Sequence, residues 1–431
     1  MNIQAARWLP ALVVILLMAT PVLAEDAAPA LTIPEGAQAG PSFDVLRATE
    51  AWVGTLSPDQ RAKSDAYFEG GYVLQFVGFL YGLGVAAVFL LTMLSCRMRA
   101  LAERIANGPF PRSVIYAVQY LLVWALLTFP LTYYEGFQRE HAYGMANNSL
   151  GAWLGDQGKD LAIEVVLGSL FVGLLYFIFR KAPRTWWVWG TVASVAFIGF
   201  VAMIGPVYLN PLFNTYKPVP EGPMREQILS LARANGIPAD DVYWFDASRQ
   251  TKRISANVSG LLGTTRISLN DNLMNRSPEE SVQAVMAHEM GHYALNHVYK
   301  MLLAFGVMSL CGFALTARLF DHIVSRWGAG LGISGIADPA GLPLLAAIVS
   351  VWFFLMTPVS NTLIRTQEAE ADIFGLNAAR QPDGFASVAM QLSEYRKIHP
   401  GKWEEIVFFD HPSGWNRARM AMAWKKEHLA P

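Results

Sequence analysis

Six long apolar stretches, separated by polar segments, dominate the 431-residue chain. Each is long enough for a helix to cross the hydrocarbon layer of a bilayer, which takes about 20 residues. Tryptophans and tyrosines lie near several ends, as at Tyr133 and Trp186, where their rings suit the headgroup level. The pattern predicts a predominantly α-helical polytopic membrane protein with spans at 72–96, 113–134, 161–179, 186–209, 299–320 and 342–363.

The first residues resemble an export signal. Arg7 precedes an apolar run over 9–23, and the small residue Ala24 comes directly before Glu25. This arrangement predicts a signal peptide over 1–24 that is cleaved after Ala24, whereas an uncleaved run would form a seventh transmembrane helix. Residues 25–43, rich in Ala, Pro and Gly, are predicted to be a flexible linker.

The segment between 210 and 298 is more polar than the spans on either side of it. Its pattern predicts a helix over 223–235, followed by short strands over 242–245, 252–258 and 264–269. We therefore expect a small α+β domain inserted between spans. The chain divides into an N-terminal membrane domain over 44–209 and a second domain over 210–431, which includes spans 299–320 and 342–363.

The charge distribution excludes some partners and predicts an orientation. Charged residues make up 16% of the chain, the net charge is −1, and no run of Lys or Arg suggests nucleic-acid binding. The loops over 97–112 and 180–184 are rich in Arg and Lys, so both should face the cytoplasm. The segment after residue 209 then emerges on the outer side, which predicts a periplasmic catalytic side in a bacterial inner membrane.

The sequence His288-Glu289-Met290-Gly291-His292 carries the most specific chemistry. On a helix, residues i and i+4 share one face, so both imidazoles can bind one zinc ion while Glu289 lies beside its open position. The preceding Ser277-Pro278-Glu279-Glu280 has the pattern of a capping box and predicts that this helix begins at about residue 278. His297 lies off the face of the motif and is interpreted as an ordinary helix or interface histidine.

A catalytic zinc requires a third protein ligand in addition to a water molecule. The acidic segment 367–372, just after the last span, offers Glu368 or Glu370, and spacing alone does not separate the two. Glu368 and Asp372 share a helix face, so one can bind the metal while the other accepts the free N–H of a ligating histidine. Asn257, on a predicted strand, is either a group that holds a substrate backbone or an ordinary turn asparagine.

At these residues the chain resembles the integral-membrane CAAX prenyl protease 1 family of zinc metallopeptidases. The matching segments are His-Glu-Met-Gly-His at 288–292, Glu-Ala-Glu-Ala-Asp at 368–372, Lys-Arg-Ile-Ser-Ala-Asn at 252–257, and His411-Pro412 followed by Arg417. The resemblance implies that Glu368 binds zinc and that Asp372 supports a histidine ligand. It also implies that His411 and Arg417 stabilise the oxyanion and that Asn257 holds the substrate backbone.

The predicted function is a membrane zinc metalloendopeptidase with one Zn²⁺ per chain, bound by His288, His292 and Glu368. Glu289 would act as general base on the zinc-bound water. Expected substrates are membrane-associated or exported polypeptides, including prenylated ones, met in or at the lipid bilayer. The alternative is a non-catalytic transporter or receptor with a structural zinc, which would not require a base at Glu289.

Overall fold

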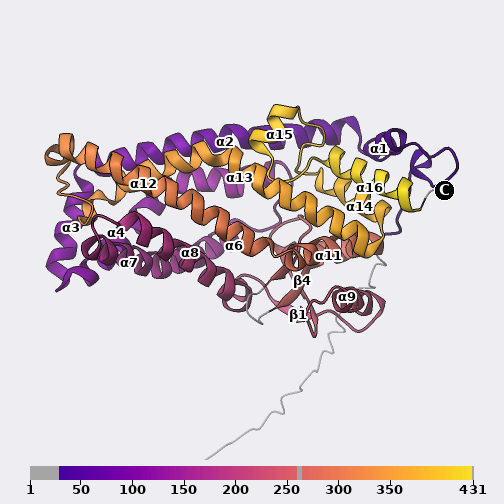
Figure 1. Cartoon of the computed structure of the whole chain (residues 1–431), viewed down its shortest axis with the longest axis horizontal. Coiled ribbons are helices and arrows are strands. Elements are labelled where there is room, and N and C mark those ends of the chain that lie inside the picture. Colours follow the sequence, from indigo (N-terminus) through magenta and orange to yellow (C-terminus); the bar gives the residue numbers. More distant parts are fainter. Residues whose placement is uncertain (1–28, 260–264, 430–431) are drawn as a thin grey trace, which may run out of the picture.

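The computed structural model describes residues 29–259 and 265–429, so the predicted signal peptide lies outside the described part. Within these ranges, six helices or helix pairs are long and apolar enough to cross a membrane, which confirms the six predicted spans. Most of them run along the long axis of the molecule (Figure 1). They are α2 (Pro58–Leu91), α4 (Pro109–Tyr133), α6 (Leu150–Ile163) continued by α7 (Ser169–Lys181), α8 (Trp186–Ile204), α12 (His297–Leu331) and α13 (Leu342–Ala379).

Shorter elements connect and extend these helices. Helix α3 (Leu94–Ile105) follows α2 at the end of the bundle that lies away from the sheet (Figure 1). Three π-helical turns lie next to membrane helices, at Tyr134–Arg139, Glu164–Gly168 and Gly205–Leu209. A π-turn widens the helix locally and shifts the side chains that follow it, so these helices are not uniform rods.

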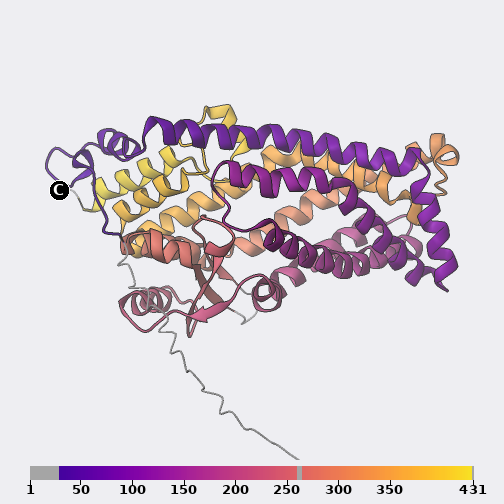
Figure 2. The same cartoon turned by 180° about the vertical axis from the view of Figure 1, so that it is seen from behind.

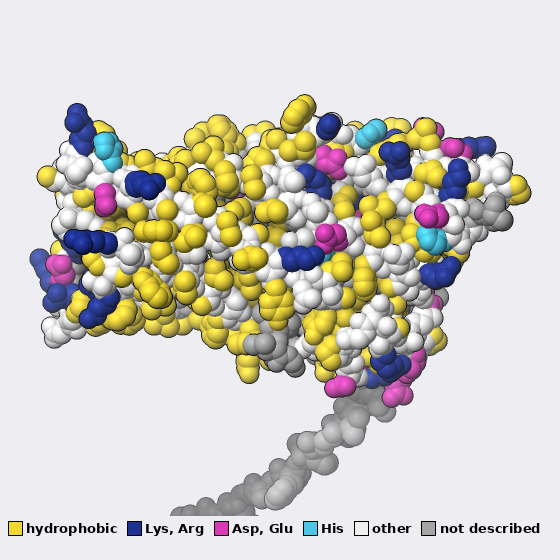
Figure 3. Space-filling view, in the orientation of Figure 1, with side chains coloured by type: hydrophobic (Ala, Val, Ile, Leu, Met, Phe, Trp, Pro, Cys, Tyr) yellow, Lys and Arg dark blue, Asp and Glu magenta, His cyan; other side chains and the backbone are white. Residues whose placement is uncertain are grey.

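Apolar side chains cover the middle of the long bundle, and charged ones gather towards its two ends (Figure 3). Several of the largest are strongly exposed, including Leu91 (75%), Leu126 (71%) and Leu303 (72%). Leaving such side chains in water would be unfavourable over so large a surface, whereas lipid chains cover them without cost. The arrangement is that of an integral membrane protein.

The inserted domain contains a four-stranded sheet of order β1-β2-β4-β3. Its strands are β1 (Tyr216–Pro218), β2 (Val242–Phe245), β3 (Ala256–Ser259) and β4 (Arg266–Asn270). Only β2 and β4 are parallel, and β3 is an edge strand that pairs antiparallel with β4. The helices packed with it are α9 (Pro223–Ala234) and α11 (Glu279–Ala294), which carries the zinc motif.

Two local predictions in this domain need correction. The strand predicted over 252–258 begins only at Ala256, because the carbonyls of Lys252 and Arg253 accept hydrogen bonds from side chains and not from a neighbouring strand. The capping box does not form either. Helix α11 begins at Glu279 after Pro278, and the Ser277 hydroxyl donates to Gln391 Oε1 at 2.8 Å.

The predicted linker over 25–43 is wrong for its described part, from residue 29 onwards. Ala37 is fully buried, and Leu31, Ile33 and Phe43 pack against a core shared with the C-terminal helices. Lys425 Nζ donates to the Ala37 carbonyl at 2.7 Å. In both views this segment and α1 (Val45–Val53) lie at the same end as the C-terminus (Figure 2).

Three helices close the chain, namely α14 (Pro382–Leu392), α15 (Lys402–Phe408) and α16 (Gly414–His428). Helix α14 packs against α11 at Gly384, where an added Cβ would lie 2.4 Å from the Glu280 carbonyl oxygen. Helix α16 packs against α14 and α1 through Ala418, Ala421 and Met422, all fully buried. These contacts bring residues from the end of the chain next to the zinc motif.

Candidate active site

Helices α11 and α13 approach closely because each has a glycine at the contact. A Cβ added at Gly291 would lie 3.2 Å from Ala371 Cα, and one added at Gly375 would lie 3.0 Å from the His288 backbone nitrogen. Backbone atoms cannot rotate away, so larger residues would force the helices apart. The close packing places the acidic face of α13 directly over the two histidines of α11.

Three potential metal ligands converge at this crossing. His288 Nε2 lies 3.1 Å from His292 Nε2 and 3.2 Å from Glu368 Oε2, and His292 Nε2 lies 3.4 Å from Glu368 Oε1. A tetrahedral zinc about 2.0–2.1 Å from each donor atom would place those atoms about 3.3 Å apart. The donor set and its spacing therefore fit a zinc ion. Glu368 lies beside His288 and His292 in this cluster, whereas Glu370 does not.

Asp372 connects this cluster to the C-terminal helix. The carboxylate is fully buried, and its Oδ1 lies 2.8 Å from His288 Nδ1. It also accepts hydrogen bonds from Arg417 Nε at 2.9 Å and from Arg417 Nη2 at 2.7 Å. Arg417 Nη2 lies 3.3 Å from Glu368 Oε2 as well. The guanidinium thus balances both buried carboxylates, which would otherwise repel each other.

His297 is not the ordinary histidine that the sequence suggested. Its ring is buried, with Nδ1 2.8 Å from His292 Nδ1 and Nε2 3.1 Å from Glu370 Oε2. Lys300 Nζ donates to the same Glu370 oxygen at 2.8 Å. A histidine ligand is oriented by the partner of its other ring nitrogen, so this chain of contacts fixes the His292 ring as Asp372 fixes that of His288.

The two ligand histidines differ in protonation before any metal binds. Burial lowers the pKa of His292 to about 4, so its ring is neutral as a ligand must be. Burial acts in the same direction on His288, but the carboxylates of Asp372 and Glu368 outweigh it and raise the pKa to about 9. A metal ion held here would require His288 to give up a proton.

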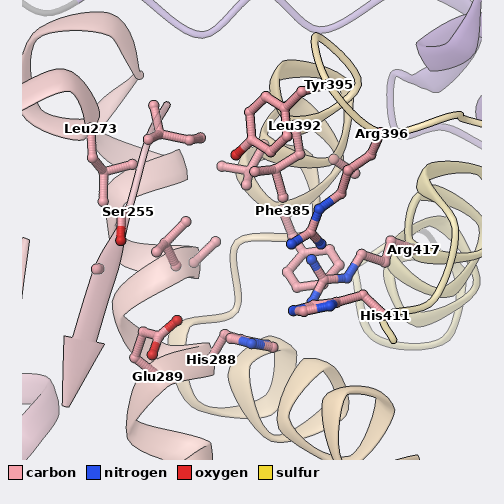
Figure 4. Close-up of a pocket in the computed structure, with 16 residues that line it drawn as sticks. Ser255, Leu273, His288, Glu289, Phe385, Leu392, Tyr395, Arg396, His411 and Arg417 are labelled. Carbon is pink, nitrogen blue, oxygen red and sulfur yellow. The ribbon is translucent and has the colours of Figure 1, made fainter. Parts of the chain in front are cut away.

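Glu289 faces a pocket beside the ligand cluster (Figure 4). Burial raises the pKa of its carboxyl group to about 7, and among the described residues it has no hydrogen-bond partner. A general base works best with a pKa near the working pH. The pocket has a volume of about 740 Å³, open solvent included, and its apolar lining comes from Leu273, Phe385, Val388, Ala389 and Leu392.

His411 and Arg417 line the same pocket, across from Glu289 (Figure 4). His411 Nδ1 lies 2.7 Å from Asp410 Oδ1, and its Nε2 lies 3.2 Å from Glu368 Oε2. Burial lowers the pKa of His411, although Asp410 opposes this. Asp410 holds the ring by one nitrogen and leaves the other directed towards the ligand cluster.

Asn257 lies on edge strand β3, but it is not among the residues that line the pocket. The lining comes from the residues just before it, Ile254, Ser255 and Ala256. The Asn257 side chain accepts a hydrogen bond from the Ser259 hydroxyl at 3.1 Å. Because β3 pairs with β4 on one side, its other backbone edge can pair with an extended peptide.

The sequence interpretation missed three groups at the site: Asp410, Arg396 and the His297–Glu370 pair. Asp410 directly precedes His411, so the adjacent acid was a signal that could have been used. Arg396 had no such signal, since it follows α14 in an irregular segment. His297 was discounted on helical periodicity, but α11 ends at Ala294 and a new helix begins at His297, which turns its ring back to His292.

A polytopic membrane fold with this cluster, a half-buried carboxylate beside it and an open pocket defines an integral-membrane metallopeptidase. Peptidase family M48 matches residues 218–425, and the CAAX prenyl protease N-terminal family, described as five membrane helices, matches residues 45–215. The chain belongs to the CAAX prenyl protease 1 family of M48 metallopeptidases. The alternative class, a transporter or receptor with a structural metal, is not supported.

Relatives of known name are similar over most of the chain. The uncharacterized metalloprotease YhfN of Bacillus subtilis is 29% identical over 378 residues, covering 87% of this chain and 88% of that protein. CAAX prenyl protease 1 of Saccharomyces cerevisiae is 28% identical over 389 residues, covering 81% and 86%. The crystal structure of S. mikatae Ste24p has the same fold, with a TM-score of 0.71, 22% identity, and coverage of 85% of this chain and 89% of that one.

Proposed function

We propose that this protein is a zinc endopeptidase that hydrolyses membrane-associated polypeptides at the α11–α13 crossing. The observation that carries the proposal is the convergence of His288, His292 and Glu368 at the spacing of a tetrahedral site. Beside it lies the carboxylate of Glu289, which pairs with none of the residues that the structure describes. A structural zinc would be enclosed by four protein ligands, whereas three ligands facing a pocket leave a position for chemistry.

Each residue of the site has a proposed task. A zinc ion in this site would lower the pKa of a bound water to about 7 and polarise the peptide carbonyl. Glu289 takes a proton from the attacking water and donates it to the leaving amine nitrogen. His411, held at Nδ1 by Asp410, directs Nε2 towards the developing oxyanion and in its protonated form donates a hydrogen bond to it. Arg417 adds positive charge there and fixes Asp372 and Glu368.

The substrate backbone is proposed to lie along β3. An extended peptide that pairs with this edge is held by main-chain hydrogen bonds, so alignment does not depend on its sequence. Asn257 then holds the backbone near the outer end of the strand. The relatives named CAAX prenyl protease 1 support a prenylated substrate class, and the apolar exterior supports substrates delivered from the bilayer.

We also propose that the catalytic domain is periplasmic, in a bacterial inner membrane. The arginine-rich segment 97–112 lies at the end of the bundle far from the sheet, and short loops rich in Arg and Lys face the cytoplasm. The catalytic residues then lie on the outer side.

The test is hydrolysis by the purified full-length chain of an unstructured polypeptide and of a farnesylated CAAX peptide, with and without a chelator. We expect cleavage that the chelator abolishes and zinc restores. Glu289→Gln should keep one zinc per chain and lose at least a hundredfold in kcat. Stoichiometric zinc in wild type without cleavage of either substrate would contradict the proposal, as would a Glu289→Gln variant as active as wild type.

A further inference from the structure

Two arginines line the active-site pocket, and one of them pairs with no carboxylate of the described residues. Arg417 is paired with Asp372 and Glu368, and His411 with Asp410. Arg396 forms no ion pair and no side-chain hydrogen bond with any residue that the structure describes. Its guanidinium points into the pocket beside the imidazole of His411 and the guanidinium of Arg417 (Figure 4).

The position of Arg396 is held by its backbone. Its carbonyl oxygen accepts a hydrogen bond at 3.1 Å from the hydroxyl of Ser64, which is buried on α2. The flanking residue Tyr395 also lines the pocket. Burial and the positive charge of Arg417 both lower the pKa of Arg396. The free side chain therefore extends from a fixed backbone into a site that disfavours an uncompensated cation.

An uncompensated arginine in a pocket is best satisfied by a carboxylate, which matches the planar fork of the guanidinium with two parallel hydrogen bonds. Asp410 and Glu368 are near enough to influence the pKa of Arg396 but form no ion pair with it. Both are occupied, by His411 in one case and by the ligand cluster in the other. Within residues 29–259 and 265–429 no carboxylate pairs with Arg396, which points to a carboxylate on a bound substrate.

The pocket also indicates which part of the substrate reaches Arg396. Glu289 lines it, and Glu289 must lie next to the leaving amine, so the residues after the cleaved bond occupy this cavity. The apolar wall of Phe385, Val388 and Leu392 suits their side chains. Glu289 and Arg396 line this one pocket, so the group that meets Arg396 belongs to a residue close to the cleaved bond.

We propose that Arg396 is a specificity-determining residue that binds a carboxylate on the leaving side of the substrate, a few residues beyond the cleaved bond. The carboxylate comes either from a free C-terminus or from an acidic side chain at that position. This inference rests on the proposed peptidase function, and the experiment keeps the two separable.

The test uses three internally quenched peptides that differ only at their C-terminal end: one with a free C-terminal carboxylate, one amidated, and one amidated with glutamate as its last residue. Wild type should cleave the free acid with a kcat/KM about tenfold to a hundredfold above that of the amide. In Arg396→Gln the value for the acid should fall to that for the amide. If the glutamate peptide restores the rate in wild type, the side-chain source is established; if it does not, the C-terminus is.

Arg396→Lys keeps the charge without the fork and should retain part of the preference. Arg233→Gln, on the exposed face of α9, is the matched control and should behave as wild type. Equal losses on acid and amide in Arg396→Gln would overturn the proposal, as would a wild type without preference.

Binding of the same peptides to Glu289→Gln protein, by fluorescence anisotropy, decides the question without turnover. Tighter binding of the acid than of the amide, abolished by adding Arg396→Gln, supports the carboxylate site even if no peptide is cleaved. Equal binding of acid and amide refutes it. Absence of cleavage in wild type would count against the peptidase function alone.

Discussion

Replacing Asp372 by asparagine tests how the ligand cluster is held. The carboxylate lies 2.8 Å from His288 Nδ1 and accepts two hydrogen bonds from Arg417, all within a fully buried site. Asparagine keeps the shape but has only one acceptor oxygen, and its NH₂ group would face a donor. Either His288 or Arg417 must lose its partner.

The expected size of the effect follows from these contacts. Losing the group that orients a ligating histidine weakens metal binding about tenfold to a hundredfold, or about 1.4–2.8 kcal/mol. Breaking a buried charge pair costs about 3–5 kcal/mol of folding free energy. Because Arg417 keeps Glu368 at 3.3 Å, we expect the lower end, about 3 kcal/mol.

The assay is zinc competition with a chelator of known affinity, combined with unfolding of the metal-free protein followed by tryptophan fluorescence. Asp240→Asn, at an exposed position before β2, is the matched control. Should Asp372→Asn bind zinc within twofold of wild type and unfold at the same denaturant concentration, Asp372 neither orients His288 nor balances Arg417.

Three further predictions follow from the structure. Gly375→Ala should separate α11 from α13 and weaken zinc binding, with a loss of about 1–3 kcal/mol in stability, whereas Gly84→Ala, with open space around it, should not; equal effects would contradict the close-packing argument. His297→Ala should raise the zinc dissociation constant about tenfold and alter the visible spectrum of the cobalt-substituted protein, unlike His322→Ala at an exposed position; an unchanged spectrum would refute the orienting role. In a Cys96→Ser, Cys311→Ser background, a cysteine at Asp240 should react with an impermeant thiol reagent in intact cells and one at Asn107 should not; the reverse pattern would invert the proposed orientation.

The sequence predicted those features that depend on local chemistry. The length of the apolar stretches was enough to predict the six spans. The i, i+4 histidines with their glutamate were enough to predict the metal motif. The packing of residues 29–43 against α16 was missed, since a composition rich in Ala and Pro does not reveal a contact with a helix almost 400 positions later. Arg396 was missed for the same physical reason. What sets it apart is the lack of an ion-pair partner among the described residues, and local sequence does not reveal such long-range contacts.

The choice between Glu368 and Glu370 as third ligand shows what the sequence alone could not predict. Glu368 and Glu370 lie in the same acidic segment, and the neighbouring sequence does not distinguish them. The glycine contacts fix which face of α13 meets α11. Once that face is fixed, Glu368 joins the histidines and Glu370 binds His297 and Lys300. The choice was a property of helix packing and not of the acidic segment.

The pairing of Arg417 with Asp372 has a consequence for the timing of synthesis. The proposed metal ligands and the proposed base are all translated before residue 370, yet the cation that balances Asp372 and Glu368 is Arg417 on α16. A nascent chain still attached to the ribosome lacks this cation at the site, and so does a chain truncated before α16. The carboxylates of Asp372 and Glu368 are therefore balanced only once α16 has been made and has packed at the site.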